Sequence, residues 1–127
     1  MEKAGGLARR VLLVEDDPSN ALTLAALLED IGVVVDTAGS VAGARAELGC
    51  RSYALLLLDL HLGDGVSTEL LPLIQQLQPS PPALLLTGAN DLCDLPQGFA
   101  AVHVKGIDPE EILTTVRRLL APPQLPP

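Results

Sequence analysis

Five short apolar runs, separated by longer amphipathic stretches, constrain the fold of this chain more than any other feature. Each run has the length of a buried strand, and the stretches between the runs carry apolar residues at helical spacing. Strands that alternate with helices predict a parallel sheet covered on both faces, because each right-handed crossover returns the chain to the same end of the sheet. We therefore expect an α/β fold with a doubly wound five-stranded parallel sheet.

The expected strands are short and rich in Leu and Val. The run that ends at Asp59 contains four successive leucines, which is typical of a strand buried on both faces, and we expect it at the centre of the sheet. Aromatic residues are scarce, so Leu, Val, Ile and Ala must build the core. The strands are expected at residues 11–14, 33–37, 53–58, from Ala83 onward, and 100–104.

Proline, glycine and small polar residues mark the ends of the expected helices. Pro18 suits the first position of a helix that Gly32 ends, with Leu22, Ala25, Ala26 and Ile31 near one face and further leucines widening that face.

Three more helices are expected from similar signals. Ser40 is a candidate cap for a helix that Gly49 ends, and a third helix is expected at 67–77. Asp108 caps the last helix, with Pro109 at its first position.

Charge and hydropathy exclude some function classes. Sixteen acidic residues against eight basic ones give a net charge of −8, which disfavours direct binding to nucleic-acid phosphates. No stretch has the roughly 20 uncharged apolar residues of a membrane span, and no signal-peptide pattern follows the first charged residues. The two cysteines lack the spacing of a zinc site or a disulfide framework. We expect a cytoplasmic protein that binds neither nucleic acid nor membrane.

Polar residues stand where the expected strands end. The carboxyl ends of parallel strands meet at one edge of the sheet, where such folds bind ligands. Carboxylates that face each other repel unless a cation neutralises them, and oxygen ligands are those that Mg²⁺ prefers. We therefore expect a site for Mg²⁺, or Mn²⁺, at this edge. The polar residues are Glu15, Asp16 and Asp17 after the first strand, Asp59 after the third, Thr87 after the fourth and Lys105 after the fifth.

Four segments together carry a family resemblance: "VLLVEDDP", "LLLLDLHLGDG", "LLLTGA" and "VHVKG". In this order and spacing they resemble a response-regulator receiver domain, of the chemotaxis-protein type, over roughly residues 8–121. The resemblance implies the flavodoxin-like receiver topology and a place in two-component phosphorelay signalling. Residues 122–127 are then a Pro-rich tail or linker.

The resemblance also implies a role for each residue of the site. Asp59 corresponds to the phosphoacceptor, which takes a phosphoryl group from a histidine kinase or a histidine phosphotransfer protein. Glu15, Asp16, Asp59 and the backbone carbonyl of His61 correspond to the metal ligands, whereas Asp17 stays outside the metal set. The remaining correspondences are the switch hydroxyl at Thr87, the phosphoryl-binding lysine at Lys105, and Gly88, which leaves room for a phosphoryl oxygen.

The chain departs from the family pattern on the side that transmits the signal. Gly106 stands where the family has a proline after the lysine, and Val102 stands where it commonly has an aromatic residue. The segment between Thr87 and Lys105 is short, which predicts a short or irregular fourth helix. The loop "LHLGDG" resembles those of receivers attached to hybrid histidine kinases.

These departures keep two further readings open beside the leading one. The leading hypothesis is Mg²⁺-dependent phosphoryl acceptance at Asp59, which switches a surface that binds a downstream protein. The alternative is a phosphorylation-independent interaction module with an atypical output face. A small phosphohydrolase is a third reading, but His61 stands where such enzymes have a second aspartate. We therefore expect no enzyme activity beyond self-catalysed phosphoryl acceptance and hydrolysis. Asp64 is interpreted as a capping residue.

Overall fold

The structure is a computed structural model that describes residues 9–106 and 108–121. Its centre is a five-stranded sheet in the order β2-β1-β3-β6-β7, in which every neighbouring pair is parallel. This confirms the predicted α/β, doubly wound fold. The strands are β1 (Arg10–Val14), β2 (Val34–Ala38), β3 (Leu55–Asp59), β6 (Ala83–Thr87) and β7 (Ala101–Val104).

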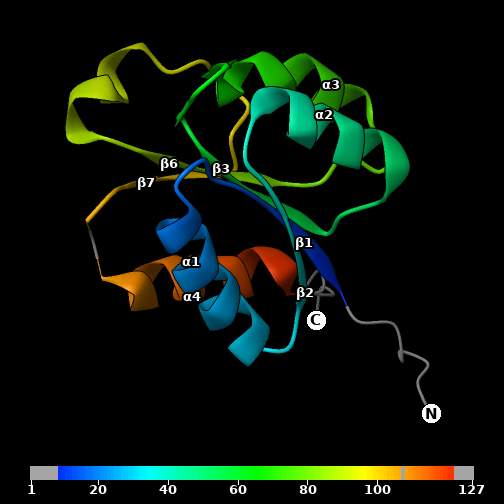
Figure 1. The fold of residues 1–127 in the computed structure, drawn as a ribbon, viewed down its shortest axis with the longest axis vertical. Coiled ribbons are helices and arrows are strands. Elements are labelled where there is room, and N and C mark those ends of the chain that lie inside the picture. Colours follow the sequence, from blue (N-terminus) through cyan, green and yellow to red (C-terminus); the bar gives the residue numbers. More distant parts are fainter. Residues whose placement is uncertain (1–8, 107, 122–127) are drawn as a thin grey trace, which may run out of the picture.

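Helices cover both faces of the sheet (Figure 1). One face carries α1 (Pro18–Asp30) and α4 (Pro109–Leu120), and the other carries α2 (Val41–Cys50) and α3 (Leu71–Gln76). None of the helices in the described ranges has the length and apolar character needed to span a bilayer. Two short 3₁₀ helices complete the set, η1 (Ser67–Leu70) and η2 (Ala89–Asp94).

The central strand β3 explains the run of four leucines. All five of its residues are buried, because helices pack on both faces of the sheet there. Leu56 and Leu58 belong to the core beneath α2 and α3, whereas Leu55 and Leu57 belong to the core beneath α1 and α4. Asp59 therefore stands at the end of a strand whose side chains are fixed from both sides.

Most of the predicted helix ends are confirmed. Asp17 caps α1, with its carboxylate accepting a hydrogen bond from the Ser19 N–H, and Pro18 is the first residue. Gly32, just beyond the helix, has a φ of +98°, a conformation that favours glycine. Asp108 caps α4 and accepts from the Glu110 N–H.

Three details of the helix predictions were wrong. Leu22 is 75% exposed and Ala26 is also exposed, because α1 turns Leu24 and Leu28 toward the sheet instead. Apolar residues on nearly every side of α1 left the buried stripe undetermined. Gly49 does not end α2, which continues to Cys50 and leaves in an extended conformation at Arg51. The third helix is η1 followed by α3 and ends one residue early, at Gln76.

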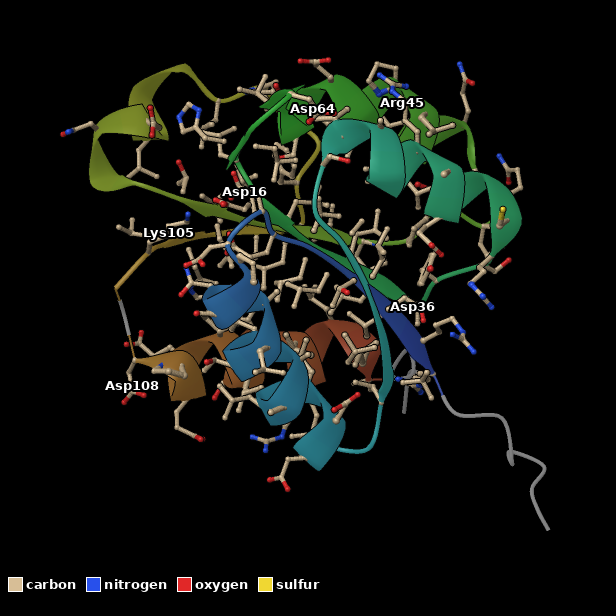
Figure 2. All side chains as sticks on the ribbon, in the orientation of Figure 1. Asp16, Asp36, Arg45, Asp64, Lys105 and Asp108 are labelled. Atoms are coloured by element: carbon tan, nitrogen blue, oxygen red, sulfur yellow. The ribbon has the colours of Figure 1, made fainter. Side chains whose placement is uncertain are left out.

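A small hairpin that the sequence did not predict follows β3. It consists of β4 (His61–Leu62) and β5 (Gly65–Val66). Asp64 lies at its turn, and its two carboxylate oxygens accept hydrogen bonds from the N–H groups of Val41 and Ala42, at 2.8 and 3.1 Å. Asp64 thus caps α2 from across the fold, which agrees with its interpretation as a capping residue (Figure 2).

The segment between β6 and β7 is short and irregular, as expected. It contains only the six-residue 3₁₀ helix η2. β7 is an edge strand of the sheet, and Val102 on it is 40% exposed. The predicted tail at residues 122–127 lies outside the described residues, and so does residue 8, where the domain was expected to begin.

Candidate functional site

The register of the sheet brings the polar strand ends together. Val14 lies opposite Leu58, so Glu15 and Asp59 follow side by side. On the other side of β3, Asp59 lies opposite Leu86, one residue before Thr87.

The ladder continues for one more residue on the next pair of strands. Thr87 lies opposite Val104, and the backbone N–H of Lys105 donates to the Thr87 carbonyl at 2.7 Å. Four of the predicted site residues thus lie at successive positions along one edge of the sheet: Glu15, Asp59, Thr87 and Lys105.

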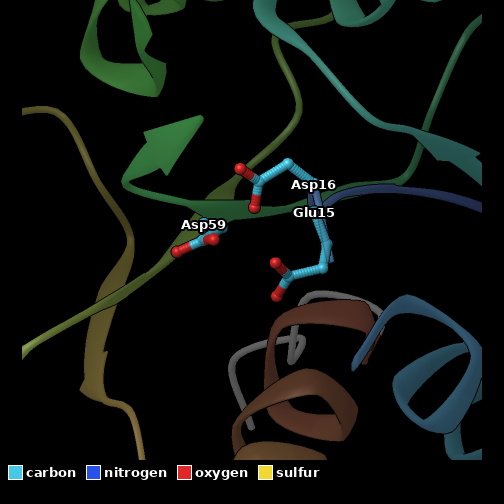
Figure 3. A group of neighbouring side chains, drawn as sticks. All are labelled: Glu15, Asp16 and Asp59. Atoms are coloured by element: carbon cyan, nitrogen blue, oxygen red, sulfur yellow. The ribbon is translucent and has the colours of Figure 1, made fainter. Parts of the chain in front are cut away.

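Three carboxylates form a compact cluster at this edge. Glu15 and Asp16 extend from the end of β1 and Asp59 from the end of β3 (Figure 3). Each offers an oxygen atom, and these atoms all lie within 4.8 Å of one another. Glu15 and Asp59 are buried, whereas Asp16 is exposed. Asp17 instead caps α1, and it is not one of these three carboxylates.

Lys105 is the cation that faces this cluster. Its Nζ lies 2.7 Å from Oδ1 of Asp59, and only 2% of Asp59 is exposed. Burial opposes the charged amine, but the hydrogen bond to Asp59 and the charges of Asp59, Glu15 and Asp16 outweigh it and raise the pKa of Lys105. Lys105 therefore stays protonated at neutral pH and holds one oxygen of Asp59.

Glu15 is the second buried carboxyl group of the cluster. Burial, supported by its hydrogen bond and repulsion with Asp59, raises the pKa of the Glu15 carboxyl from 4.5 to about 7. The N–H of Asp17, 3.2 Å from Oε2 of Glu15, and the charge of Lys105 act in the opposite direction. One lysine against three carboxylates leaves negative charge in excess, and all the donor atoms are oxygens. The residues present therefore fit Mg²⁺.

Thr87 is buried at the end of β6, and its hydroxyl donates a long hydrogen bond of 3.4 Å to the carbonyl of Gly88. The φ of Gly88 is −76°, which any residue adopts, so its backbone does not require glycine. A Cβ built on Gly88 would meet only Oδ2 of Asp91 within 4 Å, at 3.4 Å. The expected role of Gly88, to leave room for a phosphoryl oxygen, stays a prediction.

His61 reaches across to η2. Its Nε2 lies 3.2 Å from Oδ2 of Asp91, and both side chains are partly exposed. The role of the His61 backbone carbonyl as a metal ligand stays a prediction. Sequence reasoning missed Asp91, because no motif marks it and its position depends on the path of the irregular segment after Thr87.

The loop after Lys105 takes the different form that its glycine implied. Gly106 has a φ of +92°, a conformation open to glycine and closed to proline. Beside this loop, a cleft of about 240 Å³ extends between α1 and the start of α4. Glu15 and Lys105 line it together with the apolar side chains of Leu24 and Ile112.

Comparisons with known proteins agree with this geometry. Residues 11–117 match the family model of the response regulator receiver domain. The photosynthetic apparatus regulatory protein RegA of Cereibacter sphaeroides is 32% identical over 103 residues, which are 81% of this chain and 54% of RegA. The nitrogen assimilation regulatory protein NtrX of Azorhizobium caulinodans is 33% identical over 68% of this chain and 19% of its own length.

Solved structures give the same result. The response regulator protein TrrA of Thermotoga maritima, in complex with Mg²⁺ and beryllofluoride, superposes with a TM-score of 0.81 at 25% identity, covering 88% of this chain and 99% of TrrA. The non-phosphorylated HemR receiver domain of Leptospira biflexa gives 0.79 at 27% identity over 92% and 98% of the two chains. The expected likeness to receivers of hybrid histidine kinases is not supported, because the sequence relatives are regulators such as RegA, NtrX and CtrA.

Proposed function

The chain belongs to the family of response regulator receiver domains, and on that premise we propose that Asp59 is the residue that accepts the phosphoryl group. Domains of this family act in two-component phosphorelay signalling and receive the phosphoryl group from histidine kinases or phosphotransfer proteins. One observation carries the assignment to Asp59. Its carboxylate is buried at the sheet edge, 2.7 Å from Lys105 and beside the carboxylates of Glu15 and Asp16.

In the proposed reaction, a carboxylate oxygen of Asp59 attacks the phosphorus atom of a phosphohistidine on the donor protein. A bond forms between that oxygen and phosphorus, and the bond between phosphorus and the donor's imidazole nitrogen breaks, leaving its electron pair on the nitrogen. Lys105 neutralises a phosphoryl oxygen, since its amine already lies against Asp59. The Thr87 hydroxyl, at the end of the neighbouring strand β6, binds a second phosphoryl oxygen.

Glu15, Asp16, Asp59 and the backbone carbonyl of His61 are the proposed ligands of a divalent cation. Three oxygen-bearing side chains within 4.8 Å support this assignment. Mg²⁺ is the expected ion and Mn²⁺ an alternative. When bound, the cation supplies positive charge for the oxygens of the phosphoryl group during transfer.

Phosphorylation of Asp59 is then expected to alter a surface that binds a downstream protein. The new charge at Asp59 competes for Lys105 and Thr87, which lie at the ends of β7 and β6, and so biases a two-state equilibrium. A phosphorylation-independent interaction module is the weaker alternative, since three carboxylates and a lysine meet at the sheet edge. We propose no enzyme activity beyond self-catalysed phosphoryl acceptance and hydrolysis.

The matched part of the chain spans 54% of the length of RegA and 19% of the length of NtrX. We propose that residues 8–121 form the receiver domain and that 122–127 are a Pro-rich tail or linker. The net charge of −8 supports a domain that does not itself contact nucleic acid. We also propose a cytoplasmic location, in keeping with partners that transfer phosphoryl groups between proteins.

Incubation with acetyl phosphate and Mg²⁺, followed by mass spectrometry of the intact protein, tests the assignment. The wild-type protein is expected to gain one phosphoryl group and Asp59→Asn none. Asp30→Asn is a matched control, because it removes the same charge at the far end of α1, and it should be phosphorylated normally. Equal labelling of wild-type protein and Asp59→Asn would show that Asp59 is not the acceptor.

A further inference from the structure

A short chain of contacts links the residue two positions after Asp59 to the switch hydroxyl. The imidazole of His61 lies against Asp91, with Nε2 and Oδ2 at 3.2 Å. The backbone N–H of Asp91 donates to the carbonyl of Gly88 at 3.1 Å. The same carbonyl accepts the 3.4 Å hydrogen bond from the Thr87 hydroxyl. We name this set, His61, Asp91, Gly88 and Thr87, the mouth relay.

The Gly88 carbonyl is the point at which the mouth relay acts on the site. It receives two donors, the N–H of Asp91 and the hydroxyl of Thr87. A hydroxyl that donates to Gly88 cannot donate to a phosphoryl oxygen on Asp59 at the same time, since it has one proton. Thr87 must therefore release Gly88 before it can bind the phosphoryl group.

The His61–Asp91 contact is a polar connection between η2 and the hairpin, beside a cleft. A cleft of about 190 Å³ separates them, lined by Leu60 and Val66 on one side and by Asn90, Leu95 and Pro96 on the other. The His61–Asp91 contact bridges the hairpin and η2 beside this cleft. Apolar packing that would otherwise hold η2 in one position is thus incomplete where Asp91 lies.

We propose that Asp91 is a positioning residue, which acts through His61 and Gly88 to hold Thr87 in the arrangement of the unphosphorylated domain. This inference rests on the proposed role of Asp59 as phosphoacceptor. The carboxylate of Asp91 lies beside Gly88, and its contact with His61 fixes the backbone from which its own N–H donates. In this proposal the N–H of Asp91 orients the Gly88 carbonyl toward the Thr87 hydroxyl. Breaking the His61–Asp91 contact frees that carbonyl to turn away, so the Thr87 hydroxyl turns more readily to a phosphoryl group.

The affinity for beryllofluoride, which stands in for the phosphoryl group, measures this bias. Titrations with excess Mg²⁺ at one fixed pH, followed by ¹⁹F NMR, should show that Asp91→Ala binds about two- to five-fold more tightly than wild type, the range expected for a partly exposed pair. Asp30→Ala removes the same charge from the end of α1 and should bind like wild type. An affinity of Asp91→Ala equal to or below that of wild type would overturn the proposal.

A double-mutant cycle separates the mouth relay from a simple charge effect. The Asp91 carboxylate repels an anion bound at Asp59 whether or not His61 is present. If Asp91→Ala acted only through this repulsion, its full effect on beryllofluoride affinity would therefore persist in a His61→Ala background. The mouth relay predicts instead that His61→Ala raises the affinity and that adding Asp91→Ala changes it little. His61→Ala keeps the backbone carbonyl that is proposed to bind the metal.

A measurement on the protein without metal or phosphoryl mimic keeps this inference distinct from the proposed function. Protection of the amide at position 91 from hydrogen exchange, relative to the intrinsic rate of each sequence, should be lower in Asp91→Ala and His61→Ala than in wild type, and unchanged in Asp30→Ala. If Asp59 is not the acceptor, beryllofluoride binds none of the proteins, yet the exchange result still stands. Unchanged exchange in both variants would refute the mouth relay even if Asp59 is phosphorylated.

Discussion

Lys105 and Asp59 form an ion pair at the sheet edge, with 2.7 Å between Nζ and Oδ1. The aspartate is almost completely buried, whereas the lysine side chain is 44% exposed. The pair therefore joins a buried carboxylate on the central strand to a partly exposed amine just beyond β7. If Asp59 is phosphorylated as proposed, Lys105 is the partner of this pair that we expect to change position.

Lys105→Met should slow phosphoryl acceptance while leaving the fold intact. Methionine keeps most of the apolar stem but removes the charge that faces Asp59, and loss of one such donor costs on the order of a hundredfold in rate. The rate of phosphorylation by acetyl phosphate, with circular dichroism as the check on folding, measures the effect. A rate within twofold of wild type would exclude a role of Lys105 in the transfer.

Mg²⁺ should stabilise the domain against heat through the carboxylate cluster. A ligand that binds only the folded state raises its stability, by about 1.4 kcal/mol at ten times the dissociation constant. The melting temperature of wild-type protein should therefore rise with Mg²⁺, and that of Asp16→Asn much less, since Asp16 contributes one of the three carboxylates. A rise of equal size in Asp16→Asn would place the ion elsewhere.

Asp36 should make stability fall in acid. Burial acts to raise the pKa of Asp36. Hydrogen bonds from Arg10 and Tyr53 and the charges of Arg10 and Arg51 outweigh burial and lower this pKa below 3.8. Because the pKa of Asp36 is lower in the folded state, its carboxylate stabilises the fold at every pH above its unfolded-state pKa, near 3.8. This stabilisation is lost as the pH falls through its folded-state pKa. Asp36→Asn should be less stable than wild type at pH 7, with a difference that shrinks below pH 4. Urea unfolding across this range checks it, and a constant difference would contradict the prediction.

Ser67→Ala should not destabilise the protein and is expected to stabilise it. The Ser67 hydroxyl is fully buried and has no hydrogen-bond partner among the described residues. An unsatisfied buried hydroxyl costs about 1–3 kcal/mol, which alanine removes at the expense of a very small cavity. Thermal unfolding should show an equal or higher melting temperature. A loss of 1 kcal/mol or more would indicate that the hydroxyl has a partner such as a buried water.

The geometry of the candidate site was predictable because parallel topology fixes where strand ends meet. Asp59 and Lys105 are 46 positions apart along the chain, yet each follows a buried strand, and the doubly wound order puts those ends on one edge. The starts of α1 at Pro18 and of α4 after its cap Asp108 were predictable from a local signal, since proline suits the first turn of a helix.

The parts that were not predictable depend on contacts without a local pattern. Leu22 was expected inside, but the sequence of α1 offers apolar residues on several sides and only packing selects among them. The contact between His61 and Asp91 needs a hairpin and a 3₁₀ helix to approach each other, and neither element has a periodic signal. Such elements are set by tertiary structure rather than by local preference.

The single tyrosine limits how this protein can be observed. Tyr53 is buried just before β3, and its hydroxyl donates to Asp36 at 2.8 Å. The extended chain from Tyr53 to Asp59 covers about 20 Å. With no tryptophan in the chain, native ultraviolet emission reports the loss of the whole fold and is nearly blind to events at the phosphoacceptor. A tryptophan placed at the exposed position of Val102, on the edge strand that leads to Lys105, would supply the missing optical probe.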